Sequence, residues 1–112
     1  RRLAEAEEAC VVDYAFHVNP REPRRELLDE IPALAAAGFP SVKLFMNYDG
    51  YALPDDALLY AMQRVAESGG LTIVHAENKP VIDELVRQND AAGRTGLAWY
   101  GSRVPRLMAI TS

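Results

Sequence analysis

The chain has 112 residues, an apolar fraction of 49%, a charged fraction of 25% and a net charge of −4, values that are ordinary for one soluble globular domain. The acidic balance argues against nucleic-acid binding, which needs a concentrated basic surface, and we find neither a bilayer-spanning apolar run nor a signal-peptide pattern. A single cysteine, Cys10, cannot form an internal disulfide, which fits a reducing cytoplasm.

The first predicted strand covers residues 10–17 (CVVDYAFH), which are rich in valine and aromatic side chains. It follows a segment of helical composition from Arg1 to Glu8. Because Cys10 opens this apolar run, we expect it to be buried rather than reactive.

A broken helix is expected next. Helical composition begins at Arg24, and Pro32 interrupts it because proline lacks an N–H donor and clashes with the preceding turn. The helix should resume at Pro32 and end at Gly38, a good C-terminal cap. The second predicted strand, residues 41–46 (SVKLFM), follows directly.

A further helix should start after the loop that follows this strand, with Asp55 or Asp56 as its cap. Gly69 and Gly70 should end it. Its apolar positions include Leu58, Leu59, Met62 and Val65.

The third predicted strand covers residues 71–75 (LTIVH), and Asn78 is expected to cap the last helix, which has Pro80 in its first turn. Residues after Arg94 show no periodicity, so we expect a tail over 97–112 that is irregular apart from possible helical turns. The last helix should end at Gly93, with Ile82, Leu85 and Val86 facing inward.

Apolar strands that alternate with helices indicate an α/β fold with a parallel sheet. We expect about three consecutive βα units in which the strands pair in sequence order and each is covered by its following helix. Such a chain is too short to close a (β/α)8 barrel, which takes roughly 250 residues. It has no glycine-rich nucleotide-binding motif, which weakens a nucleotide-binding alternative.

Lys43 is unusual because it lies inside an apolar strand. It could extend its ammonium to water, which is the common fate of such a lysine. Alternatively, desolvation could lower its pKa and leave a nucleophilic amine. That amine can add carbon dioxide to form a carbamate, whose two oxygens could bridge two metal ions about 3.5–4 Å apart.

His75 ends the third predicted strand, at the edge where α/β barrels place their active sites. Alone it could be a hydrogen-bonded rim residue. However, Lys43 and His75 lie on successive predicted strands, about one βα unit apart. Adjacent parallel strands would direct both side chains into one cavity.

The segments SVKLFMNY and IVHAEN resemble the dihydropyrimidinase and hydantoinase family of cyclic amidohydrolases, as do VVDYAFH and IPALAAAGFPSVK. The resemblance covers roughly residues 13–96. It implies an internal piece of a TIM-like (β/α)8 barrel from a metal-dependent hydrolase that opens hydantoin or dihydropyrimidine rings. It also implies a small cyclic amide or ureide as substrate and a homo-oligomeric (tetrameric) complete protein.

By this resemblance, Lys43 corresponds to the carboxylated lysine that bridges a binuclear Zn²⁺ site, and His75 to a histidine ligand of one zinc. Tyr48 corresponds to the tyrosine that binds the substrate carbonyl and stabilises its oxyanion. Glu77 and Asn78 match the motif, but we expect loop hydrogen bonds and helix capping from them.

Several features of the family pattern are missing. His17 matches the family's strand, yet we expect it to be a hydrogen-bonded core or rim histidine. The His-x-His pair, another histidine ligand and the late aspartate are absent, and the sequence after Gly96 departs from the family. We therefore expect the chain alone to be inactive. The alternatives are a non-catalytic, assembly-forming relative, which commonly loses the bridging lysine, and an unrelated α/β binding module.

Overall fold

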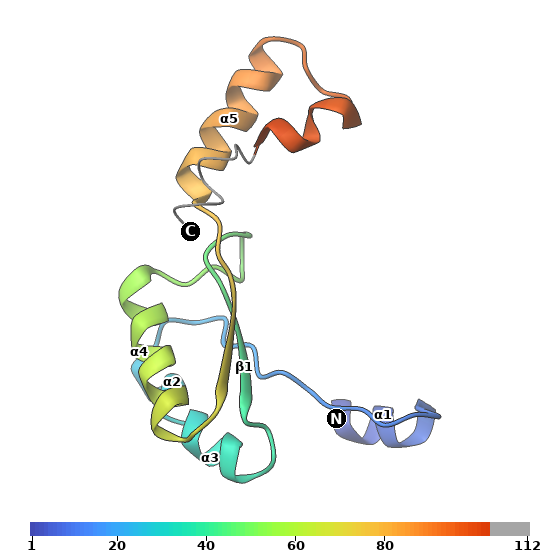
Figure 1. Ribbon diagram of the computed structural model, residues 1–112, viewed down its shortest axis with the longest axis vertical. Coiled ribbons are helices and arrows are strands. Elements are labelled where there is room, and N and C mark those ends of the chain that lie inside the picture. Colours follow the sequence, from blue (N-terminus) through green and yellow to red (C-terminus); the bar gives the residue numbers. More distant parts are fainter. Residues whose placement is uncertain (104–112) are drawn as a thin grey trace.

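The computed structural model describes residues 1–103 and contains a two-stranded parallel sheet with helices on one side (Figure 1). Its principal extents are 50 × 36 × 23 Å and its radius of gyration is 17.5 Å. A compact domain of this length would have a radius of about 13 Å. The molecule is therefore elongated, with one packed region and two projecting ends. None of the helices in residues 1–103 could cross a membrane.

The packed region is built around the unit β1 (Ser41–Phe45), α4 (Asp55–Glu67) and β2 (Leu71–His75). Ser41 of β1 pairs with Leu71 of β2, and the register continues to the pair Phe45 and His75. Both strands agree with the sequence-based expectation, β1 ending one residue early. The carboxyl ends of both strands therefore lie at the same edge of the sheet.

The predicted helix break near Pro32 is confirmed. It separates α2 (Arg25–Leu28) from α3 (Ile31–Ala36), and Pro32 lies in the first turn of α3. Gly38 follows with a φ of +100°, a conformation that glycine adopts without steric cost. The helices α2 and α3 pack on α4 and close the bottom of the packed region (Figure 1).

One face of the sheet and the inner sides of α2, α3 and α4 form the core. The α4 helix contributes Ala57, Leu58, Ala61 and Val65 to this core, whereas its other apolar residues Leu59 and Met62 are exposed. Asp55 and Asp56 lie in the first turn of α4, but Pro54 is the N-cap and no side chain caps this end. The buried members of the core are Leu28, Ile31, Val42, Leu44, Leu53, Ala57, Leu58, Ala61 and Val65.

Gly70 permits a close approach between the turn after α4 and the turn before β1. A Cβ atom at this position would lie 2.3 Å from the carbonyl oxygen of Pro40 and 3.1 Å from a methyl group of Val65. That same Pro40 oxygen accepts a hydrogen bond from Leu71 N–H at 2.9 Å. Gly70 thereby sets the spacing at which β2 begins beside β1.

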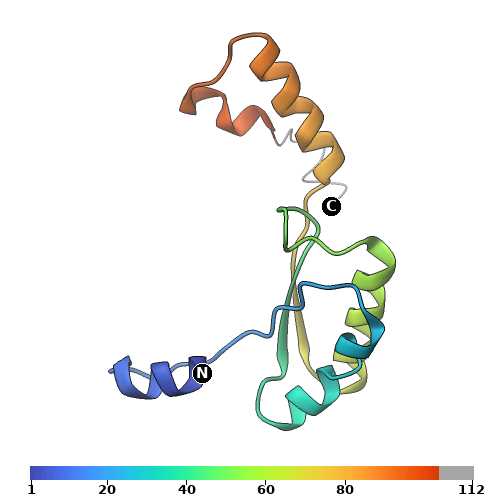
Figure 2. The ribbon, with the colours of Figure 1, turned by 180° about the vertical axis from the view of Figure 1, so that it is seen from behind.

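The prediction of a strand over residues 10–17 is wrong. This segment has no strand hydrogen bonds, Cys10 is exposed, and Val11 is 97% exposed. A parallel bridge to β1 forms only at Val18, which pairs with Val42. The preceding helix, α1 (Arg2–Ala9), also projects away from the sheet (Figure 2). High β-propensity alone did not produce a strand here. Within the described residues, this segment has neither a neighbouring strand to pair with nor a helix that covers it.

The last helix, α5 (Lys79–Ala91), does not cover β2 as expected but extends beyond the carboxyl edge of the sheet (Figure 1). Asn78 caps it as predicted, because its Oδ1 accepts a hydrogen bond from Val81 N–H at 3.2 Å. A 3-10 helix, η1 (Leu97–Arg103), folds back onto α5. The remainder of the predicted tail, residues 104–112, lies outside the described residues.

Candidate metal centre

Lys43 and His75 lie on the same face of the sheet. Lys43 pairs with Ile73, and Phe45, two residues farther along β1, pairs with His75. Side chains alternate between the two faces of a sheet and register partners share a face. Val42 and Leu44, the residues before and after Lys43, are buried in the core. The face that carries Lys43 and His75 is thus the one that no helix of the packed region covers (Figure 1).

Phe45 lies between the two candidate ligands. The Lys43 Nζ is 5.2 Å from the centroid of the Phe45 ring, within the range of a cation–π contact. The Phe45 and His75 ring centroids are 6.0 Å apart. Lys43 is half-buried, so its stem packs along the open face while its amine lies over an aromatic ring.

The His75 ring is held at the carboxyl edge by aromatic and charged neighbours. Its centroid lies 5.0 Å from that of the Tyr48 ring. Its Nε2 lies 3.1 Å from Glu77 Oε2, an ion-pairing distance. This contact lacks hydrogen-bond geometry, so Nε2 is buried without a hydrogen-bond partner. The Glu77 carboxylate therefore orients the His75 ring but does not supply a well-aligned hydrogen bond to its Nε2.

Tyr48 lies on the loop that follows β1, as expected. Its φ is +74°, which no other non-glycine residue among residues 1–103 shares in sign. Its carbonyl accepts hydrogen bonds from Tyr51 N–H at 3.1 Å and Ala52 N–H at 2.9 Å. These bonds form a tight turn that folds the Tyr48 ring over His75, with 48% of the residue still exposed.

Asn47 connects the two loops at this edge. Its Nδ2 donates a hydrogen bond to Glu77 Oε2 at 3.0 Å, and its Oδ1 accepts one from Tyr48 N–H at 2.8 Å. The bond from Asn47 and, next, the contact with His75 lower the pKa of the Glu77 carboxyl. Glu77 is therefore ionised at neutral pH, and it has the loop hydrogen bond that we expected.

The structure does not bring His17 into this group. His17 is exposed, and its Nδ1 lies 2.7 Å from the Oγ of Ser41, the first residue of β1. It is thus a hydrogen-bonded rim histidine at the opposite end of the strand from His75. The sequence predicted a hydrogen-bonded core or rim histidine, and the exposure of His17 rules out the core position.

Two residues of the site carried no assigned role in the sequence-based analysis. Phe45 could have been found, because it lies two residues after Lys43 and a strand places such residues on one face. Asn47 could not, because an asparagine in a loop is ordinary and its partner Glu77 is 30 residues away.

Two observations show how far residues 1–103 could hold a metal ion. Residues 1–103 contain no group of three or more His, Cys, Asp or Glu side chains that could hold a metal. However, the Glu77 carboxylate lies 3.1 Å from His75 Nε2, the kind of support that metal-binding histidines commonly have on the nitrogen that does not bind the metal. Lys43 faces the same side of the sheet. These residues fit part of a metal centre, whose remaining ligands would come from elsewhere.

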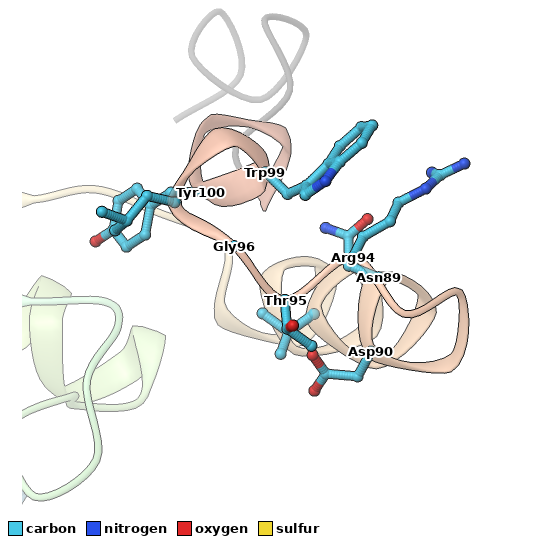
Figure 3. Close-up of a pocket in the computed structure, with 9 residues that line it drawn as sticks. Asn89, Asp90, Arg94, Thr95, Gly96, Trp99 and Tyr100 are labelled. Carbon is cyan, nitrogen blue, oxygen red and sulfur yellow. The ribbon is translucent and has the colours of Figure 1, made fainter.

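A separate cavity of about 150 Å³ lies between α5 and η1 (Figure 3). Arg94 lies over the Trp99 ring, 4.9 Å from its centroid, and Asn89 donates a hydrogen bond to Ser102 Oγ at 2.9 Å. These contacts fasten η1 to α5. Neither Lys43 nor His75 lines this cavity.

No family profile matches the chain, but it is similar to curated proteins and to solved structures. The chain is 44% identical over 99 residues to a D-hydantoinase of Streptomyces coelicolor, covering 88% of this chain and 21% of that protein. It is 40% identical over 96 residues to a D-phenylhydantoinase of Escherichia coli O9:H4, covering 86% of this chain and 21% of that protein.

Solved structures show the same relationship. A D-hydantoinase structure superimposes with a TM-score of 0.84 at 27% identity, covering 95% of this chain and 24% of that one. Dihydropyrimidinase from Brevibacillus agri NCHU1002 gives a TM-score of 0.83 at 30% identity, covering 96% and 24%. These similarities in sequence and fold exclude the alternative that the chain is an unrelated α/β binding module. The chain spans about a fifth of the length of its curated relatives, and over that stretch it is homologous to hydantoinases and dihydropyrimidinases.

Proposed function

We propose that this chain supplies one wall of the active site of a metal-dependent hydrolase that opens cyclic amide rings. The observation that carries the proposal is the placement of Lys43 and His75 on one uncovered face of a parallel sheet, close to its carboxyl edge. In a (β/α)8 barrel this face would be the interior, and this edge would be the active-site mouth.

Lys43 would bridge two zinc ions as a carbamate. Its neutral amine would add to carbon dioxide and lose one proton, which gives a carbamate whose single negative charge is shared by two oxygens. The half-buried Lys43 side chain lies on the face that would line the interior of a barrel. The zinc pair, when bound, would act as a Lewis acid that activates water for attack on the ring carbonyl.

His75 and Tyr48 would have different roles at the reacting carbonyl. His75 would ligate one zinc through Nδ1, because its Nε2 faces the Glu77 carboxylate, in the way that metal-binding histidines are commonly supported. The Tyr48 hydroxyl would donate a hydrogen bond to the substrate carbonyl oxygen and stabilise the negative charge that develops there. Its place over His75 puts the donor beside the metal ligand.

The substrates would be hydantoins, dihydropyrimidines or related cyclic ureides. The complete, active protein would be a homotetramer. The present chain alone would be inactive, because Lys43 and His75 are too few to hold zinc where about four ligands are usual. A non-catalytic, assembly-forming relative is the second candidate. Retention of Lys43 favours the enzyme.

A chimera tests this proposal. The stretch of Streptomyces coelicolor D-hydantoinase that is 44% identical to this chain would be replaced by this sequence, and hydrolysis of hydantoin and dihydrouracil would be measured with zinc present. We expect activity, and we expect Lys43→Ala and His75→Ala each to reduce kcat/KM at least about a hundredfold.

The matched control is Arg87→Ala, which removes an exposed cation on α5 and should leave activity close to that of the unmodified chimera. A chimera that folds and binds zinc but hydrolyses neither ring would contradict the proposal. Undiminished activity in Lys43→Ala would contradict the role of that residue.

A further inference from the structure

Asn47 is the only polar residue that the structure buries within residues 1–103, with 8% exposure. A buried amide is costly unless its donor and acceptor are both satisfied. Here they are, and by groups from two different loops: the backbone N–H of Tyr48 and the carboxylate of Glu77. These partners also settle which amide atom is which, because an N–H requires the oxygen and a carboxylate requires the nitrogen.

The first partner is a backbone in an unfavourable conformation. Tyr48 has a φ of +74°, which an L-residue with a bulky side chain rarely adopts. Acceptance of the Tyr48 N–H by Asn47 Oδ1 at 2.8 Å helps to hold this conformation. The conformation in turn places the Tyr48 ring over His75.

The second partner leads to His75. The Glu77 oxygen that accepts from Asn47 Nδ2 at 3.0 Å also lies 3.1 Å from His75 Nε2. The orientation of the histidine ring thus depends on a carboxylate that Asn47 holds in place. The Asn47 side chain is therefore linked to His75 through Glu77 and to Tyr48 through the Tyr48 backbone N–H.

We propose that Asn47 is a positioning residue that couples Tyr48 to His75 across the two loops at the carboxyl edge. It would act through Tyr48 and Glu77, the two residues to which it is hydrogen-bonded. It fixes the backbone of the proposed oxyanion donor and the carboxylate behind the proposed metal ligand. This inference rests on the proposed function for its meaning, but its geometry can be tested without metal or substrate.

Two substitutions separate the two halves of the coupling. Asn47→Asp keeps an oxygen that can accept from Tyr48 N–H but replaces the donor to Glu77 by a second carboxylate oxygen. Asn47→Ala removes both hydrogen bonds. The matched control is Asn89→Ala, which deletes a hydrogen bond from α5 to Ser102 of η1, away from this edge.

The measurements are amide hydrogen exchange at Tyr48 and the ring ¹⁵N chemical shifts of His75, both by NMR on the 112-residue chain. In Asn47→Ala we expect Tyr48 exchange to accelerate up to about tenfold, the value of one hydrogen bond, and the His75 ring shifts to change. In Asn47→Asp the His75 shifts should change while Tyr48 remains protected. Asn89→Ala should alter neither.

If Asn47→Ala does not fold, the nearly isosteric Asn47→Asp decides the matter alone. Unchanged His75 shifts in Asn47→Asp would overturn the proposal, as would loss of Tyr48 protection in that variant. Failure of the chimera to hydrolyse cyclic ureides would leave these spectra unaffected. The proposed function and the coupling can therefore fail independently.

Discussion

The packed region from Val18 to His75 and the projecting unit of α5 and η1 are stabilised in different ways. The packed region holds every member of the hydrophobic core, whereas α5 contributes only one buried residue, Ile82. Charged pairs within one or two turns, such as Lys79 with Asp83 and Glu84 with Arg87, line the α5 surface. The site lies where the two regions meet, so its carboxyl edge combines a rigid sheet with a more weakly held neighbour.

The largest effect should come from the core. Leu44 is fully buried on β1, so Leu44→Ala should lower the free energy of unfolding by about 2–5 kcal/mol. Urea denaturation followed by circular dichroism measures this. Leu59→Ala on the exposed side of α4 is the control and should change stability by less than about 0.5 kcal/mol. Equal losses in both variants would show that the packed region is not organised around this face.

Gly70→Ala should have the next largest effect. Its Cβ would lie 2.3 Å from the Pro40 oxygen, and that backbone atom can move only if β1 and β2 shift. We expect a loss of about 1–3 kcal/mol in unfolding free energy. Gly96→Ala, where nothing lies within 4 Å, serves as the control. A neutral Gly70→Ala would mean that the turns are looser than the structure shows.

Asn78→Ala should affect α5 and spare the packed region. Loss of the cap bond to Val81 N–H costs about 1 kcal/mol, so amide exchange in α5 should accelerate about fivefold. Amides of α4 should keep their rates, and Asn78→Ser should restore most of the protection. If exchange in α4 accelerates equally, the packed region and α5 unfold together, which would contradict their separate stabilisation.

The smallest effect should be a slight loss of α5 helicity at low pH. Arg87 first, then Gln88, lower the pKa of Glu84 to about 2. Because the folded-state pKa lies below the unfolded value of about 4.3, the stabilisation is present above that value and is lost as the pH falls towards 2. The helicity of α5 should decline slightly over that interval, and in Glu84→Gln this part of the decline should be absent. An NMR titration of the Glu84 carboxyl gives the pKa directly.

The sequence predicted those elements that carry their own signals. The strands at 41–45 and 71–75 have apolar, β-rich compositions, Pro32 marks the helix break, and Asn78 with Pro80 marks the start of α5. The segment 10–17 has similar composition but no strand forms, because strand formation depends on partners that composition does not reveal. The position of α5 was missed for the same reason.

The candidate site was predicted in part. Lys43 and His75 share a face and Tyr48 lies on the following loop, as the spacing and the resemblance indicated. Asn47 was not found, because its contacts join residues from two loops that approach each other only after folding. Whether Lys43 and His75 bind metal stays a prediction.

The most direct test is metal analysis with mass spectrometry of Lys43, on the purified chain and on the hydantoinase chimera, both in zinc and bicarbonate. A carbamate persists when two metals neutralise it, and the ligands available on this chain are too few to hold zinc firmly. We predict unmodified Lys43 and substoichiometric zinc in the isolated chain, and carboxylated Lys43 with stoichiometric zinc in the chimera. Stoichiometric zinc with carboxylated Lys43 in the isolated chain, or neither in a folded chimera, would contradict the account.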